Sequence, residues 1–339
     1  MNARIRVGTS GWSYPSGRGA WNGVFYPARR PRGFDELRYY AEHFDTVEVN
    51  STFYRMPDPG TTRQWVERTP AGFEFSVKLY QKFTHPDMYL ARDEVTDWNL
   101  SRGDVDEFRV GVDPLARAGR LSAILMQFPS SFHAQPETRD YLDWLLTAFG
   151  EFPLAVELRH RSWSDEAEKV DRILSAHHAT WAAIDEPKFK DSIGFRGSEV
   201  PGFRGSQVSA DVPEVPAADP RTPEPRNPGT PEPDTRLTYI RLHGRNASAW
   251  WDHAAAEDRY NYLYSPEELA PFAATARQVA ASGRKVVMYL NNHFSAKSVA
   301  NAAVLKQALG QAVPGEYPRV MVERYPELAG VVATSGLPL

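Results

Sequence analysis

Eight short runs rich in β-branched and aliphatic residues recur along the chain, and this repetition constrains the fold more than any other feature. Most of these runs end in polar residues, and segments with helical spacing separate them. The runs are Ile5–Gly8, Thr46–Asn50, Phe73–Lys78, Ser122–Gln127, Leu154–Arg159, Thr180–Asp185, Leu237–His243 and Val286–Asn292. Alternation of strand and helix predicts an α/β fold with a parallel sheet, and eight repeats predict a TIM-type (β/α)8 barrel.

The length of the chain fits one such barrel, because 339 residues lie within the usual range for this fold. We therefore predict a single domain over residues 1–339. Sustained periodicity is lost after Asp185, and nine prolines fall between Pro201 and Pro233. Residues 186–236 are therefore predicted to form a proline-rich loop inserted after the sixth strand. Such a loop emerges at the face that carries active sites, so it is either a lid or a passive insertion.

Composition excludes several classes of protein. The chain has no cysteine, which excludes thiol nucleophiles, Cys-ligated zinc, iron–sulfur clusters and disulfides. The net charge of −4 provides no overall basic field for nucleic acid or anionic lipid. No apolar run approaches the roughly 18 residues of a membrane helix, and the first strand begins too near Met1 for a signal peptide. We expect a soluble, cytoplasmic protein without a membrane partner; its oligomeric state is not predicted.

Side-chain alternation indicates which polar residues face the barrel axis. In the second run Val47 and Val49 are apolar and are expected to face the helices, which sends Glu48 and Asn50 to the axis. Asp185 and Gln127 lie at strand ends. The same alternation turns the following residues inward: Glu74, Ser76, Lys78, Glu157, Arg159, Arg241, His243, Tyr289 and Asn291.

The upper layer of the barrel is thus predicted to bring acids and bases together. The acids are Glu48, Glu157 and Asp185, and the bases are Lys78, Arg159 and Arg241. Unpaired buried charges cost several kcal/mol each, so these groups are expected to pair. One interpretation is a structural ion-pair network that plugs the barrel. We favour a functional site, because barrel layers are normally filled by Val, Ile and Leu and exceptions concentrate at sites.

The favoured hypothesis is an enzyme that acts on a small polar anionic substrate, phosphorylated or carboxylated and sugar-like, by acid–base chemistry. The residues expected to be catalytic are Glu48, Glu157 and Asp185, as candidates for the general base, His243, as a proton shuttle, and Lys78, which would hold the anion together with Arg159 and Arg241. The residues expected to bind substrate are Gly8, Thr9, Ser10, Trp12, Asn50, Tyr54, Gln127, Arg159, His160, Arg241, Tyr289, Asn291 and Asn292.

Two local patterns have a functional and a structural interpretation. The turn from Gly8 to Gly11 follows a strand, so its backbone N–H groups are candidates for binding a phosphate or carboxylate. A tight turn alone would also explain the two glycines. Aromatic residues such as Trp12, Tyr54 and Trp251 gather near the strand ends. Their flat rings suit a sugar or a nucleobase, and packing between loops is the structural alternative.

Other chemistries are weighed against the same residues. Lys78 would form a Schiff base if desolvation lowered its pKa, although a salt bridge to Glu48 is the favoured state. Glu48 and Glu157 could form a pair of the glycosidase type. His85, His160, His243 and His293 with the acids could hold a divalent metal, but no H-x-H or H-E-x-x-H spacing supports it, and three nearby cations oppose it. No cofactor is predicted, and a metal is kept as the less favoured alternative.

The strand ends also carry a set of motifs. These are Val7–Trp12, Phe44–Arg55, Thr84-His85, Gln127–Pro129, Val156–His160 with Ser162-Trp163, Tyr239–Gly244, and Asn291–His293 through Asn301-Ala302. Together they resemble the YecE-like family, domain-of-unknown-function family 72, over essentially the whole chain. The proline-rich segment 198–236 is longer than the family pattern needs.

The resemblance implies a TIM-type barrel and does not bring an established reaction. Similarity of the family to endonuclease IV has prompted proposals of nucleic-acid binding, which gives the first alternative hypothesis: a nucleic-acid-binding protein or phosphodiesterase. The matching residues here are a mixed acid–base cluster instead of a dense set of zinc ligands, so a small-molecule substrate is favoured. The second alternative is a non-catalytic barrel whose proline-rich loop binds other domains.

Overall fold

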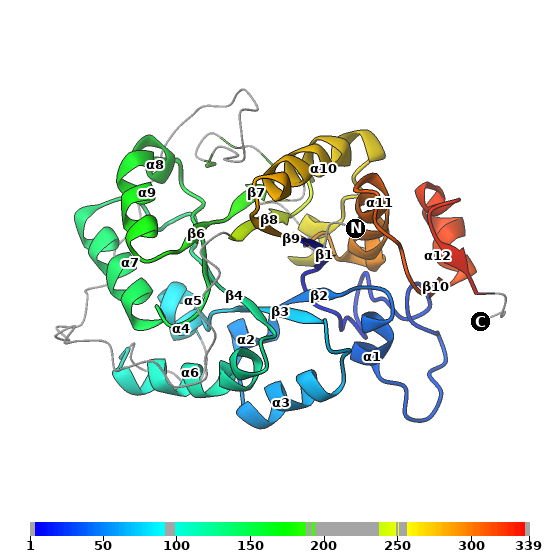
Figure 1. The fold of residues 1–339 in the computed structure, drawn as a ribbon, viewed down its shortest axis with the longest axis horizontal. Helices are drawn as coiled ribbons and strands as arrows, with labels where there is room; N and C mark the ends of the chain where they lie inside the picture. Colours follow the sequence, from blue (N-terminus) through cyan, green and yellow to red (C-terminus); the bar gives the residue numbers. More distant parts are fainter. Residues whose placement is uncertain are drawn as a thin grey trace.

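The structure is a computed structural model, and it describes residues 4–91, 99–187, 189, 192–193, 237–248, 250 and 256–335. Its strands form two parallel sheets of four and five strands, with a separate two-stranded pair near the C-terminus. The four-stranded sheet has the order β1-β9-β8-β7, and the five-stranded sheet has the order β2-β3-β4-β5-β6. The predicted α/β fold with parallel strands is confirmed, and all eight predicted runs contain strands (Figure 1).

The strands agree with the predicted runs to within one or two residues at most ends. Their bounds are β1 Ile5–Thr9, β2 Thr46–Val49, β3 Glu74–Lys78, β4 Leu121–Gln127, β5 Leu154–Glu157, β6 Thr180–Trp181, β7 Ala183–Asp185, β8 Leu237–Leu242, β9 Lys285–Leu290, β10 Glu316–Tyr317 and β11 Ala333–Thr334.

Helices surround the strands in Figure 1. Their bounds are α1 Glu36–Ala41, α2 Ser51–Tyr54, α3 Pro59–Glu67, α4 Gln81–Thr84, α5 Pro86–Leu90, α6 Arg102–Arg117, α7 Pro136–Ala148, α8 Arg161–Asp165, α9 Ala167–Ala176, α10 Pro266–Ala281, α11 Lys297–Ala308 and α12 Arg319–Arg324, with 3-10 turns at Ala256–Tyr260, Phe294–Ala296 and Pro326–Leu328. Local sequence explains several starts: α6 and α10 each begin with a capping box, from Ser101 and Ser265 respectively. No helix in the described ranges is both long and apolar enough to cross a bilayer.

The sixth predicted strand passes from one sheet to the other. Its first half, β6, pairs with β5, and its second half, β7, pairs with β8, with Ala182 between them. The opposite edges of the two sheets also approach each other. There Ser10 and Glu48 form an isolated parallel bridge, and the Gly11 N–H donates to the Glu48 carbonyl at 2.7 Å. The two sheets are therefore in contact at both edges.

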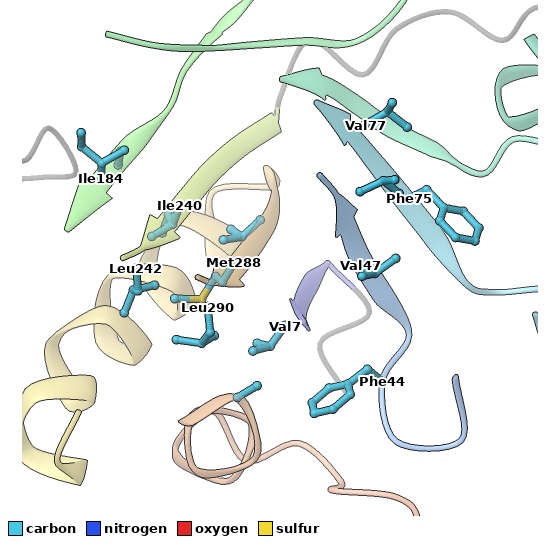
Figure 2. Close-up of a cluster of buried hydrophobic side chains, with 14 of the residues drawn as sticks. Val7, Phe44, Val47, Phe75, Val77, Ile184, Ile240, Leu242, Met288 and Leu290 are labelled. Atoms are coloured by element: carbon cyan, nitrogen blue, oxygen red, sulfur yellow. The ribbon is translucent and has the colours of Figure 1, made fainter. Parts of the chain in front are cut away.

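Alternating side chains separate two apolar clusters. The larger one lies between the strands and the helices and includes Val47, Ile240 and Met288 (Figure 2). The smaller one faces the interior between the sheets. Its members are Ala123, Leu125, Ala155, Ala182, Leu237, Tyr239, Val287 and Tyr289. Since these residues come from strands of both sheets, the sheets face each other across this cluster, as the alternation predicts.

Polar groups lie on either side of the inner cluster. Near the amino ends of the strands, Glu74 is paired with Arg6 at 3.1 Å and with Lys285 at 2.5 Å. Just above, the Tyr289 hydroxyl bonds to the hydroxyls of Thr46 and Ser76. The carboxyl ends carry a second charged group, and this end has the residues that the sequence singles out.

The proline-rich insertion predicted for residues 186–236 falls between β7 and β8, and most of it lies outside the described residues. Two of its described residues contact the strand ends. Ser192 forms an isolated bridge with His160, and the Ile193 N–H donates to the Arg159 carbonyl at 2.9 Å. The start of the insertion therefore lies beside the end of β5.

Candidate functional site

Arg241 is at the centre of the charged group at the carboxyl ends of the strands. Its Nε and Nη2 atoms donate to the two carboxylate oxygens of Glu48 at 2.9 and 2.6 Å. Its Nη1 atom donates to Glu157 and, at 3.0 Å, to Gln127 Oε1. Arg241 is 1% exposed, and both carboxylates are fully buried. Because β8 and β2 belong to different sheets, the Arg241–Glu48 pair joins the sheets across the interior.

Several donors engage both carboxylates, and Glu157 is held in the charged form. Burial alone would raise the pKa of Glu157, but Arg241 and Arg159 together lower that pKa well below its usual value. Glu48 accepts hydrogen bonds from Arg241 and also from the Tyr239 hydroxyl, which donates to Glu48 Oε2 at 2.7 Å. Tyr239 is a site residue that we did not single out from the sequence, although the alternation puts it on the same face as Arg241 and His243.

Arg159 extends the network toward solvent, and the fully buried His243 lies beside it. The Nε of Arg159 donates to Glu157 at 2.6 Å, and its Nη1 lies 3.9 Å from the carboxylate of Glu186. The Asn291 amide donates to Nδ1 of His243 at 2.9 Å, so this ring nitrogen is an acceptor. Burial, and next the positive charge of Arg241, lower the pKa of His243 to about 4, so the ring is neutral near pH 7. The Arg159 side chain retains 19% exposure.

Lys78 differs from the other charged groups of the site. Its Nζ lies 3.8 Å from the centroid of the Phe53 ring, and among the described residues it has no hydrogen bond or carboxylate partner. The predicted salt bridge from Lys78 to Glu48 is wrong, because Arg241 and Tyr239 take the oxygens of Glu48. Burial, and next the positive charge of Arg241, lower the pKa of Lys78 to about 7. Near neutral pH the amine is therefore present in both its charged and its neutral form.

Aromatic rings lie around Lys78 and the Arg241 network. His85 meets the edge of Phe53 with ring centroids 4.9 Å apart, and burial together with Lys78 lowers the pKa of His85 to about 3. Tyr14 is stacked on His293 at 4.4 Å, and Tyr260 contacts the same histidine at 4.8 Å. These rings lie near the network. Tyr14 is close enough to Glu48, and Tyr260 to Arg159, for their charges to interact.

Tyr54 and Trp12, two aromatic residues predicted to bind substrate, lie in different surroundings. Tyr54 is 61% exposed and packs against Phe53, so it remains accessible from solvent. Trp12 instead contacts Trp65 of α3 edge-on at 5.6 Å, on the side of the helices. Trp251 lies outside the described residues.

Asp185 is not brought into the network. Its carboxylate accepts hydrogen bonds from Arg245 Nε and Nη2 at 2.9 and 3.0 Å and from the Tyr264 hydroxyl at 2.7 Å. Arg245 is also paired with Glu268 of α10. The prediction that Asp185 joins the acid–base cluster is therefore wrong. The groups that hold it come from the segment after β8, which strand alternation does not describe.

The glycine turn after β1 does not offer free N–H groups. The Thr9 N–H donates to the Tyr40 hydroxyl at 2.9 Å, the Ser10 N–H to the Leu290 carbonyl at 3.0 Å, and the Gly11 N–H to Glu48. The predicted anion cradle is therefore wrong. Gly8 has a packing reason instead, because a Cβ atom there would lie 2.2 Å from the Thr46 carbonyl oxygen.

Three further residues that were predicted to bind substrate form hydrogen bonds within the protein instead. His160 caps α8, accepting from the Ser162 N–H at 3.2 Å, and its ring is stacked on His133. The Asn292 amide donates to the Tyr262 carbonyl and to Asn301. The Tyr289 hydroxyl is held below the network by Thr46 and Ser76. None of the three contacts the Arg241 network through a hydrogen bond that the described residues show.

Ser10 and Asn50 remain candidates for contact with a ligand. Within the described ranges, the buried Ser10 Oγ and Asn50 Oδ1 atoms have no hydrogen-bond partner. Buried polar atoms normally have a partner, so these two atoms are available to hydrogen-bond a ligand. The alternative of a metal site gains no support, since no group of three or more His, Asp or Glu side chains in the described part is arranged to hold an ion.

The comparisons with known proteins agree with the predicted resemblance. The family model described as "Protein of unknown function DUF72" matches residues 6–322. The UPF0759 protein YunF of Bacillus subtilis is 25% identical over 321 residues, which is 93% of this chain and 98% of YunF. The UPF0759 protein YecE of Escherichia coli is 29% identical over 176 residues, and this match spans about half of each chain, 51% and 55%.

Solved structures support the fold. A DUF72 family protein from Thermotoga maritima has a TM-score of 0.66 and 28% identity, over 91% of this chain and 99% of its own. A DUF72 family protein from Enterococcus faecalis has a TM-score of 0.68 and 22% identity, over 90% of this chain and 95% of its own. The chain, with its parallel sheets and its buried acid–base network, belongs to the DUF72 family of proteins of unknown function.

Proposed function

We propose that the two sheets form one (β/α)8 barrel and that the protein is an enzyme acting on a small polar molecule with an anionic group. Two features support the barrel: the sheets touch at both edges, and one apolar cluster contains strands of both. In such barrels the active site lies at the carboxyl ends of the strands. Glu48, Lys78, Glu157 and Arg241 all lie at or near those ends.

The observation that carries the proposal is the state of Lys78. Arg241 is compensated by Glu48 and Glu157, whereas Lys78 has an aromatic ring beneath it and no carboxylate partner in the described part. An ammonium group without a carboxylate partner lowers the stability of the fold, and such costs concentrate at functional sites. A pKa of about 7 also suits a group that exchanges protons near neutral pH. We therefore assign the acid–base role to Lys78.

The remaining site residues then take supporting roles. Glu48 and Glu157, first considered as general bases, hold Arg241 in place, since their oxygens are engaged by guanidinium groups. Arg159 is the more exposed arginine and would receive the anionic group of the substrate. His243 is neutral and its Nδ1 accepts from Asn291, so Nε2 carries the ring proton and faces the Glu157 carboxylate at 3.6 Å; His243 therefore helps to position Glu157.

An anion bound beside Lys78 would favour its ammonium form, because opposite charge raises the pKa of an amine. The bound complex would then contain a proton that Lys78 can donate to a developing oxyanion on the substrate. This arrangement supports proton transfer at a carbonyl or at a leaving oxygen. No metal and no other cofactor is needed for such a step, and none is part of the proposal.

The nucleic-acid alternative has weaker support. Its basic groove would need several arginines open to phosphates, whereas Arg241 is buried between Glu48 and Glu157, and Arg245 is held by Asp185 and Glu268. Binding to single-stranded DNA that weakens steeply with salt would favour this alternative. The hypothesis of a partner-binding loop concerns residues that lie mainly outside the described ranges.

A metabolite-depletion experiment tests the proposed function. The wild-type protein is incubated with a mixture of phosphorylated and carboxylated metabolites, in parallel with Arg159→Met and with Arg161→Met. Arg161 is the matched control, because it pairs with Asp165 on the surface of α8. We expect the wild type and Arg161→Met to deplete the same compound. Arg159→Met should be roughly 10- to 100-fold slower, the effect of losing one charged hydrogen-bonding partner.

Mass spectrometry of the mixture over time gives the readout. If no compound is depleted by the wild type, the protein is not an enzyme for this substrate class. If Arg159→Met is as fast as the wild type, Arg159 does not receive the substrate anion, and that part of the proposal fails.

A further inference from the structure

A second feature lies beside the charged network: an apolar cavity of about 370 Å³. It lies between the α4–α5 segment on one side and the segment after β4, with α7, on the other. Its walls are largely apolar and include the aromatic residues Phe83, Phe128, Phe132 and Tyr141. The volume lies within the range of about 300–1,000 Å³ that is typical of small-molecule sites, which are lined mainly by apolar groups.

The rim of this cavity exposes apolar side chains. Met88 and Leu90 of α5 line it and are 48% and 40% exposed. Among the described residues only two other large hydrophobic side chains, Tyr54 and Val110, are comparably exposed. Exposed apolar groups that gather around a concavity are typical of binding sites. Among the described residues of the lining Asp87 is the one that carries a charge, so this part of the cavity suits an uncharged group.

Two side chains, those of His85 and Phe53, lie between the cavity and Lys78. His85 lines the cavity, and the edge of Phe53 contacts His85 with centroids 4.9 Å apart. Phe53 also contacts Lys78, whose Nζ lies 3.8 Å from the centre of the ring. One aromatic ring and one neutral imidazole therefore lie between the amine and the apolar space. A ligand with an acidic end and an apolar end could engage both.

We propose that this cavity binds the apolar end of the substrate, an aryl or branched alkyl group, while its carboxylate or phosphate lies at Lys78 and Arg159. The inference rests on the proposed function and names its substrate class: amphipathic organic acids, in place of the fully polar, sugar-like compounds expected from the sequence. The lining around Phe128 and Phe132 supplies the apolar surface, and the charged network supplies the counter-charge.

A series of simple acids tests this inference with the full-length protein. The probes are acetate, phenylacetate, 3-phenylpropionate and 4-phenylbutyrate, with dissociation constants measured by calorimetry or by ligand-observed NMR. Each buried methylene is worth about a fourfold gain in affinity. We therefore expect the best phenylalkanoate to bind at least about 30-fold more tightly than acetate. The chain length at the optimum reports the span between Lys78 and the cavity.

Three variants separate the two ends of the ligand. Ser131→Trp fills the cavity from its lining, and Ser130→Trp places the same side chain on the neighbouring exposed residue as a matched control. We expect Ser131→Trp to weaken 4-phenylbutyrate at least tenfold and to leave acetate unchanged, which also shows that the variant is folded. Ser130→Trp should change neither. Lys78→Met should weaken both acids by a similar factor.

The outcomes distinguish this inference from the proposed function. If all four acids bind equally, or if Ser131→Trp leaves 4-phenylbutyrate unchanged while Lys78→Met weakens it, the cavity inference is overturned and the charged site stands. If Ser131→Trp weakens the ligand and Lys78→Met has no effect, the ring binds without the charged end. The idea of one ligand spanning both sites then fails together with the role of Lys78.

Discussion

Replacing Arg241 with methionine should lower the free energy of unfolding by about 3–5 kcal/mol, the usual cost of removing one partner from a buried ion pair. The variant leaves the carboxylates of Glu48 and Glu157 without their shared guanidinium in a region from which water is excluded. Chemical unfolding in urea, followed by circular dichroism, measures the change. The loss should be largest near neutral pH, because Arg241 and Arg159 lower the pKa of Glu157 and keep its carboxylate charged there.

A surface pair provides the control for this substitution. Arg117 and Asp113 lie one turn apart on α6 with an exposed guanidinium, so Arg117→Met should cost less than about 1 kcal/mol. The combined variant Arg241→Met, Glu48→Gln, Glu157→Gln removes the uncompensated charges, and it should be more stable than Arg241→Met alone. If Arg241→Met costs no more than Arg117→Met, the network is not the buried structure described above.

Lys78→Met should lower the turnover of any compound that the wild type consumes by about 10²- to 10⁴-fold, the range typical of losing a general acid–base group. Lys82 of α4, which is paired with Asp104, is the matched control, and Lys82→Met should retain turnover. Initial rates at a saturating substrate concentration give the comparison. Full activity of Lys78→Met would reject the acid–base role.

The stability of Lys78→Met distinguishes this loss from unfolding. The pKa of Lys78 is lowered from 10.5 to about 7, so between these values the unfolded chain binds a proton that the folded protein does not. The wild type therefore gains stability as pH rises through this window, and at pH 7 and below it carries the full cost of the buried ammonium. We expect Lys78→Met to be at least as stable as the wild type near pH 7. Its advantage should shrink toward pH 10.5.

Much of the architecture could be predicted because each strand carries its own signal. Apolar alternation in Thr46–Asn50 and in Leu237–His243 indicates both the strand and its inward face. It correctly places Glu48 and Arg241 on one side, even though they are far apart in the chain. The family motifs lie on the same strand ends, which explains why the resemblance and the physical argument point to one region.

Partners could not be predicted in the same way. Lys78 is close to Glu48 in the sheet order, yet Arg241 reaches Glu48 from the facing sheet with two parallel hydrogen bonds, a geometry that a lysine cannot match. The N–H of Thr9 is taken by Tyr40, which comes from a helix. Alternation indicates the face of a side chain and does not indicate which of several candidates forms the contact.

The central claim is that Lys78, which has no carboxylate partner among the described residues, exchanges protons near neutral pH. The most direct measurement is an NMR titration of the protein labelled with ¹³C at the lysine ε carbons. The chain has eight lysines, and Lys78→Met identifies the signal of Lys78. The account predicts one lysine that titrates with a midpoint near pH 7. A midpoint above pH 10 for Lys78, as in an ordinary surface lysine, would contradict it.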